Sequence, residues 1–239
     1  MTSKPPQPHR SPIRYSASRP PKKAERVTEW VRSAVAGQDW RVRAVLVPIL
    51  AWYLYRHLGD FTYSGIYGGL NLALHEAGHP LFSWVGNETL TAAGGTLFEM
   101  LCPILASIMF YRQRDVFGMS VAVFWLGTTF LDAAPYAADA RAQMLPLVTI
   151  GDGPVGHDWF NMLYRFELLQ YDQQIAGALR TIGLALLITS IVAGIWVLKL
   201  MREERVSGRE PPLSAAKTGF GLSVEEERFR SRFGDDLPQ

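Results

Sequence analysis

The stretch LHEAGH at residues 74–79 lies inside an apolar run that extends over residues 67–85, and the rest of the chain is organised around it. On a helix, His75 and His79 are four residues apart and share one face, so their imidazoles can converge on one metal ion. The spacing is the H-E-x-x-H pattern, in which the glutamate, here Glu76, can act as general base for a water molecule. Two histidines and a carboxylate are costly to bury at membrane depth, so their apolar setting indicates a functional site.

Apolar segments fill the middle of the chain, whereas both ends are polar. Hydrophobic residues make up 48% of the 239 residues, and because the ends contribute few of them, the centre is far more apolar than this average. The sequence therefore predicts an all-α integral membrane protein, a bundle of about four to six membrane helices. The candidate membrane segments are residues 43–58, 62–85, 97–111, 116–134 and 179–201.

A polar stretch rich in Gly and Thr, GNETLTAAGGT at residues 86–96, interrupts the apolar segments directly after the HEAGH helix. Clusters of this composition are typical of turns and loops. We expect a short β-like hairpin or a re-entrant loop here, and we expect residues 89–96 to line a polar pocket through which water reaches the metal.

The chain divides into three regions. Residues 1–40 are rich in Pro, Ser, Lys and Arg, which predicts a basic, mostly disordered N-terminal tail with an interfacial helix over residues 26–40. Residues 41–205 form the membrane domain, and residues 206–239 form a polar C-terminal tail.

A segment at residues 135–180 differs from the membrane helices around it. It contains the glycine-rich turn IGDGPVGHDW and an amphipathic pattern near residues 160–178, and we expect it to cap the membrane domain at the water boundary.

Basic residues in the N-terminal tail and after Met201 argue that both ends are cytoplasmic. Five full spans would separate the two ends, so either residues 43–58 or the HEAGH helix is expected not to cross completely.

Charge and cysteine content exclude several classes of partner and site. The formal net charge is +2 and the basic surplus lies in the N-terminal tail, which favours contact with a lipid bilayer over binding of nucleic acid. The single cysteine, Cys102, can form neither an intrachain disulfide nor a multi-cysteine metal site. The first 40 residues lack an apolar core of the kind found in signal peptides, so no cleavable signal peptide is expected.

A catalytic zinc site needs a third protein ligand and an open position for water. Glu99 follows His79 by twenty residues, on the next apolar segment, and Asp158 beside His157 could orient a histidine ring through a hydrogen bond. The residue types alone leave the choice of third ligand open. The candidates are Glu99, Asp132, Asp139 and His157.

One known family shares this order of motifs. Over roughly residues 65–145 the chain resembles the site-2 proteases. The resemblance rests on HEAGHPLFSWVG, followed by Gly94-Gly95, then LFEMLCPILASIMF and an Asp-bearing membrane segment. In that family HExxH lies on a membrane helix, a glycine-containing β-like segment follows, and a later membrane segment supplies an Asp as third ligand. The nearest match to that Asp is Asp139 in AADAR, ahead of Asp132 in FLDAAP. The Leu-Asp-Gly and Asn-Pro motifs of the family are absent, so the resemblance is to a compact, divergent bacterial branch.

The resemblance implies an intramembrane zinc metalloendopeptidase of the bacterial inner membrane. It would hydrolyse peptide bonds of membrane proteins or peptides in or near the bilayer, with Zn²⁺ held by His75, His79 and Asp139 and with Glu76 as the catalytic base. His157 and Asp132 are the alternative ligands, and His157 could instead stabilise the oxyanion. The alternative functions are a catalytically silent membrane zinc-binding protein and a non-enzymatic membrane subunit. The sequence specifies no oligomeric state.

Overall fold

The computed structural model describes residues 23–146 and 156–208, and the regular structure in these ranges is entirely helical. The predicted all-α class is therefore confirmed for this part of the chain. The predictions for the outer parts of the two tails concern residues 1–22 and 209–239, which lie outside the described residues. The elements are α1 (Lys23–Val35), α2 (Trp40–Ala44), α3 (Leu46–Gly59), α4 (Gly65–Ser83), α5 (Glu88–Arg112), α6 (Val116–Ala138), α7 (Asp158–Arg165), the 3-10 helix η1 (Leu169–Tyr171) and α8 (Asp172–Val206).

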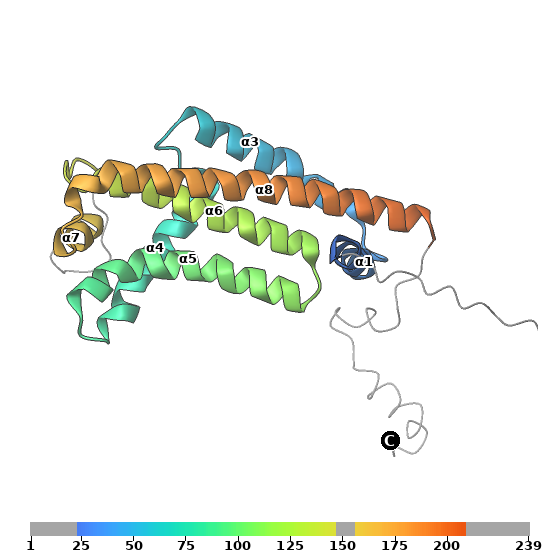
Figure 1. Ribbon diagram of the computed structural model, residues 1–239, viewed down its shortest axis with the longest axis horizontal. Helices are drawn as coiled ribbons and strands as arrows, with labels where there is room; N and C mark the ends of the chain where they lie inside the picture. Colours follow the sequence, from blue (N-terminus) through green and yellow to red (C-terminus); the bar gives the residue numbers. More distant parts are fainter. Residues whose placement is uncertain (1–22, 147–155, 209–239) are drawn as a thin grey trace, which may run out of the picture.

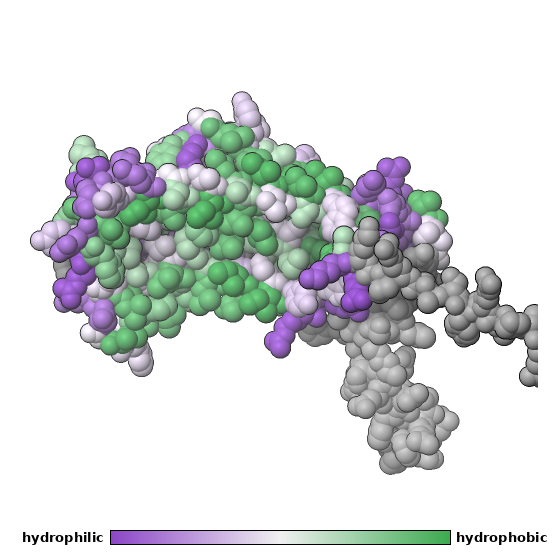
Figure 2. Space-filling view, in the orientation of Figure 1, coloured by the Kyte–Doolittle hydropathy of each residue, from purple (hydrophilic) through white to green (hydrophobic). Residues whose placement is uncertain are grey.

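Three helical stretches in the described residues are long and apolar enough to cross a membrane: α5, α6, and η1 together with α8. They lie side by side along the long axis of the molecule (Figure 1). More of α6 is buried than of the other two, because α6 packs against both α5 and α8. Apolar side chains cover the middle of the face seen in Figure 2, and polar side chains gather at its two ends. This distribution is that of a membrane protein.

Helices α6 and α8 approach each other closely at two glycines. A Cβ atom added to Gly127 would lie 2.9 Å from the carbonyl oxygen of Gly183, and a Cβ atom on Gly183 would lie 2.9 Å from that of Gly127. Small residues at such crossings let two backbones come into contact in the absence of a hydrophobic driving force between helices. The crossing fixes α6 against the longest helix of the molecule.

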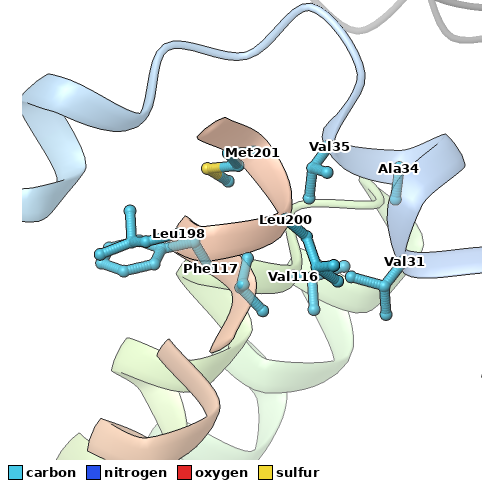
Figure 3. Packing of buried hydrophobic residues seen from close by; sticks show 9 residues of the cluster. Val31, Ala34, Val35, Val116, Phe117, Leu198, Leu200 and Met201 are labelled. Atoms are coloured by element: carbon cyan, nitrogen blue, oxygen red, sulfur yellow. The ribbon is translucent and has the colours of Figure 1, made fainter. Parts of the chain in front are cut away.

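Helix α1 lies at the end of the bundle where α8 finishes (Figure 1). Val31 and Val35 of α1 are buried with Val197 and Met201 of α8, in a cluster shown in Figure 3. The structure thus has a helix over the first part of the predicted range, residues 26–35, and the apolar face of this helix packs against protein.

The predicted β-like hairpin after the HEAGH helix is wrong for the described residues. The stretch at residues 88–96 forms the first turns of α5, and the Asn87 side chain caps this helix by accepting a hydrogen bond from the Leu90 N–H at 3.0 Å. The glycines that suggested a turn instead allow close helix packing, because Gly94 lies where α4 and α5 come into backbone contact.

The amphipathic helix predicted near residues 160–178 is divided in two. Helix α7 ends at Arg165, Glu167 adopts a positive φ of 57°, and α8 begins at Asp172. The predicted span at residues 179–201 therefore belongs to a longer helix that starts seven residues earlier.

Candidate metal centre

The HEAGH motif lies on α4 at the point where this helix crosses α5. A Cβ atom on Gly78 would overlap the carbonyl oxygen of Gly94 and lie 2.9 Å from the Cα atom of Gly95. A Cβ atom on Gly95 would lie 2.6 Å from Nε2 of His75 and 2.7 Å from Nε2 of His79. The glycines at 78, 94 and 95 therefore bring the helices together and leave a free volume beside the two imidazoles.

Both imidazoles are oriented by an acceptor on α5 that faces Nδ1. Nδ1 of His79 lies 2.9 Å from the carbonyl oxygen of Thr91, and Nδ1 of His75 lies 3.4 Å from Oε2 of Glu99. Metal-binding histidines commonly donate one ring N–H to a carbonyl or carboxylate, which leaves the other nitrogen unprotonated toward the metal. Here that arrangement directs both Nε2 atoms toward the same point.

The third group at this point is Asp158, the first residue of α7. Its Oδ2 atom lies 3.2 Å from Nε2 of His75 and 3.3 Å from Nε2 of His79. Among the described residues, these three side chains are the group that could hold a metal ion, with their ligand atoms all within 4.8 Å of one another. Tetrahedral zinc with bonds of about 2.0–2.1 Å requires ligand atoms about 3.3 Å apart, so the separations of Asp158 Oδ2 from the two Nε2 atoms fit that geometry.

Tyr136 on α6 holds Asp158 in position. The Tyr136 hydroxyl donates to Oδ2 of Asp158 at 3.2 Å and accepts the Asp158 backbone N–H at 3.1 Å. Burial by itself would raise the pKa of Asp158, but in the metal-free protein hydrogen bonds and positive charge from protonated His75 and His79 outweigh it and lower the pKa to about 2. The carboxylate is therefore an anion at neutral pH, as a metal ligand must be.

Asp139, which the sequence ranks first as third ligand, lies elsewhere. Its two carboxylate oxygens accept the backbone N–H groups of Met144 and Leu145 at 2.9 Å each, which stabilises the turn after α6. Oδ2 of Asp139 also lies 3.4 Å from Nε2 of His157. Asp139 is thus paired with His157, and Asp158 is the carboxylate that lies with His75 and His79.

His157 is buried and acts as the N-cap of α7, where its Nδ1 accepts the Phe160 N–H at 3.2 Å. Burial lowers the pKa of His157, although the facing Asp139 carboxylate acts in the opposite direction. Its Nε2 atom faces Asp139, so neither ring nitrogen is directed at the two metal-binding histidines. Its local effect is to fix the start of α7 and hence the position of Asp158.

The remaining two candidates surround the centre without belonging to the metal-holding group. Glu99 is buried on α5 and orients His75, as described above. Asp132 on α6 accepts a hydrogen bond from Asn71 at 2.6 Å, and Asn71 in turn accepts one from the Trp125 indole at 2.8 Å. This network ties α4 to α6 one turn before His75.

A cleft of about 1630 Å³ opens onto the metal centre. It is lined by α4, the first turns of α5, the end of α6 and α7, and its lining includes both histidines, Asp158 and the Glu76 side chain. Thr89, Thr91 and Thr96 also line it, so the prediction that the Gly/Thr stretch borders the pocket is confirmed, although on a helix and not a hairpin.

No protein-family model, no curated protein and no solved structure matches this chain. The chemistry of the centre is therefore inferred from its own geometry.

Sequence reasoning gave Asp158 only an orienting role, and one signal could have placed it with the two histidines. The segment GHDWF contains Asp158 directly before an apolar pair, and an acidic residue at this place favours a helix start. The first side chains of such a helix can face a neighbouring site, and in α7 the acidic one does so.

Proposed function

We propose that this chain is a membrane-embedded zinc metallopeptidase. The observation that carries the proposal is the convergence of Nε2 of His75, Nε2 of His79 and Oδ2 of Asp158 at the base of a cleft that also contains Glu76. Proteins use two imidazoles and one carboxylate, with one position left open, to hold hydrolytic zinc.

The donor set supports zinc over the common hard cations. Ca²⁺ and Mg²⁺ prefer sites built from oxygen atoms, whereas two of the three donors here are imidazole nitrogens. The rings are pre-oriented by Thr91 and Glu99, which supports a site built for a metal. A bound zinc ion would supply Lewis-acid polarisation of a carbonyl and activation of water at neutral pH.

Glu76 is the proposed general base. It follows His75 on α4 and lines the cleft, so its carboxylate can take a proton from the attacking water and deliver it to the leaving amine. Helix α4 continues past Pro80 to Ser83, and a proline at this position cannot donate to the carbonyl four residues earlier, which is that of Glu76. The carbonyl of Glu76 therefore lacks its helical hydrogen bond.

The proposal includes the membrane setting. The proposed bundle of about four to six membrane helices adds α3 and α4, which together would make one crossing, to the three long helical stretches. The proposed location is the inner membrane of a bacterium, and the proposed substrates are membrane proteins or peptides in or near the bilayer.

Zinc content and cleavage test the proposal together. The full chain is purified in detergent, zinc per chain is determined, and cleavage of membrane-peptide reporters is compared for the wild type, Glu76→Gln and Glu88→Gln. Glu88 also lines the cleft but lies outside the motif, so it is the matched carboxylate control. We expect stoichiometric zinc in all three proteins and loss of cleavage only in Glu76→Gln.

Two outcomes would contradict the proposal. Stoichiometric zinc without cleavage by any of the three proteins would favour a catalytically silent zinc-binding protein. A chain without zinc would favour a non-enzymatic membrane subunit.

A further inference from the structure

The two ends of the helical bundle differ in their content of Lys and Arg. The end that carries α1, here the basic end, has ten such residues in the described part of the chain: three in α1, two in α2, two at the α5–α6 junction and three in the last turns of α8. The end that carries the metal centre, here the metal end, has four: one in the last turn of α3, one in the turn after α6, one in α7 and one in the first third of α8.

The basic end is a single packed unit, so its charges belong to one side of the molecule. Arg32 of α1 pairs with Glu203 and Glu204 of α8 at 2.7 Å each. Arg114 at the α5–α6 junction donates to the Ser33 hydroxyl of α1 at 2.9 Å. The N-terminal helix, the α5–α6 junction and the end of α8 therefore lie on the same side of the membrane.

The number of membrane crossings agrees with this arrangement. Helix α5 runs from the metal end to the basic end, α6 runs back to the metal end, and α8 returns to the basic end (Figure 1). Since α1 also lies at the basic end, the chain between α2 and α5 must make one net crossing. Helix α3 has 14 residues, about 21 Å at 1.5 Å per residue, which is too short for a bilayer core of about 30 Å. Helix α4 completes this crossing at the metal end.

Lys and Arg flanking membrane helices are retained on the cytoplasmic side. We propose that the basic end is cytoplasmic and that the cleft takes extended peptide segments from the extracytoplasmic side of the membrane. The substrate class is a segment of another membrane protein just outside the bilayer. This substrate class rests on the proposed peptidase function, whereas the orientation does not.

The position of the cleft supports access from outside the bilayer core. Its lining includes Tyr164 and Arg165 of α7 and Leu145 and Pro146 of the turn after α6, all at the metal end. Trp84 beside the cleft has 92% of its surface exposed, as expected of an aromatic anchor at the membrane–water boundary. The metal centre is thus close to the metal-end surface of the membrane.

Cysteine labelling tests the orientation without any need for zinc or activity. Cys102 is the single cysteine, so Cys102→Ser gives a thiol-free background. Two exposed glutamines provide a matched pair: Gln170 at the metal end and Gln113 at the basic end. In right-side-out membrane vesicles, a membrane-impermeant maleimide is expected to label Gln170→Cys and not Gln113→Cys, and inside-out vesicles are expected to give the reverse. The opposite pattern, or labelling of both from the same side, would overturn the proposed orientation.

A pair of reporters tests the substrate class. The same peptide sequence is placed just outside the bilayer on either the extracytoplasmic or the cytoplasmic side of a single-span carrier, and each carrier is expressed with the wild type or Glu76→Gln. We expect a product only from the extracytoplasmic reporter with the wild type. Cleavage of the cytoplasmic reporter alone would overturn the substrate class. Cleavage of neither, with the expected labelling pattern, would overturn the peptidase function and leave the orientation standing.

Discussion

Three side-chain atoms define the proposed metal position, and the identity of the third ligand, Asp158 or Asp139, is the point to test. Oδ2 of Asp158 lies 3.2 Å from Nε2 of His75, whereas Asp139 faces His157. Asp158→Asn and Asp139→Asn are therefore matched changes with different expected results. Loss of a residue that only orients a ligand lowers metal affinity by about 10–100-fold. Asp158→Asn should lower zinc affinity by more than this, because it removes the charge of a proposed ligand. Asp139→Asn should retain stoichiometric zinc, and metal titration of the purified proteins checks both.

Thermal unfolding of the metal-free proteins is the control for this pair, because Asp139 also holds the turn at Met144 and Leu145. Loss of zinc in Asp139→Asn with retention in Asp158→Asn would reverse the assignment of the third ligand.

Gly95 leaves free the volume that the proposed metal ion and its open coordination position would require. A Cβ atom there would lie 2.6 Å and 2.7 Å from the two Nε2 atoms. Gly95→Ala is therefore expected to abolish stoichiometric zinc binding. Gly177→Ala on α8 is the control, because nothing lies within 4 Å of its added Cβ atom. Zinc analysis of both variants, with circular dichroism to verify helix content, measures the effect. Full zinc in Gly95→Ala would mean that the ion lies away from the two Nε2 atoms.

At this scale, spacing along one helix was predictable and contact between distant segments was not. The four-residue spacing on α4 predicts that His75 and His79 share one face, and the structure brings the two imidazoles together. Glu76 was predictable from the same motif. Helices α5 and α6 lie between His79 and Asp158 in the chain, so the packing of α7 against these two helices brings Asp158 near. No pattern within a segment encodes that packing.

At the level of elements, the centre depends on how closely α4 and α5 approach each other. A Cβ atom on Gly78 would overlap the Gly94 carbonyl oxygen and lie 2.7 Å from its carbon, and backbone atoms cannot rotate away as a side chain can. Gly78→Ala is expected to destabilise the fold by about 1–3 kcal/mol because the helices must separate. Gly69→Ala on the same helix has open space around its Cβ atom and should stabilise by up to about 1 kcal/mol. Thermal unfolding in detergent compares the two, and equal melting temperatures would contradict the backbone contact.

The same crossing explains why the hairpin prediction failed. Two adjacent glycines after a membrane helix resemble a turn when the sequence is considered alone. At positions 94 and 95 they instead allow α4 to lie directly on α5, while Asn87 supplies the cap that starts α5. The sequence does not distinguish a glycine needed for close helix packing from a glycine needed for a turn. The two roles differ only in which element lies beside the glycine.

In the whole molecule, the metal centre and the α1 contact lie at opposite ends of the three long helices (Figure 1). The all-helical class and the central apolar region followed from composition, because membrane helices need long apolar runs. The position of α1 on α8 did not follow, because its buried valines gave the same amphipathic pattern that a helix lying on a bilayer would give.

The separation of the two ends predicts that they respond independently to mutation. Arg32→Ala removes the ion pairs to Glu203 and to Glu204, of which the latter has only 3% of its side chain exposed. Arg32 itself is about one-third exposed, so solvent screens these ion pairs. The α1–α8 contact is therefore expected to lose about 1–2 kcal/mol of stabilising free energy. Hydrogen–deuterium exchange should therefore accelerate in α1, while Val31 and Val35 keep the helix attached. Arg26→Ala, an exposed position on the same helix, is the control and should leave exchange in α1 unchanged.

Exchange in α4 and in the first turns of α5 should be the same in both arginine variants and the wild type, because α1 contacts α6, α8 and the last turn of α5, away from the α4–α5 crossing. Local opening follows the contacts of each region, so loss of one peripheral contact raises exchange only where that contact protected the backbone. If Arg32→Ala accelerated exchange around His75 as strongly as in α1, the bundle would open as one cooperative unit. The metal centre would then depend on a contact at the opposite end of the membrane helices.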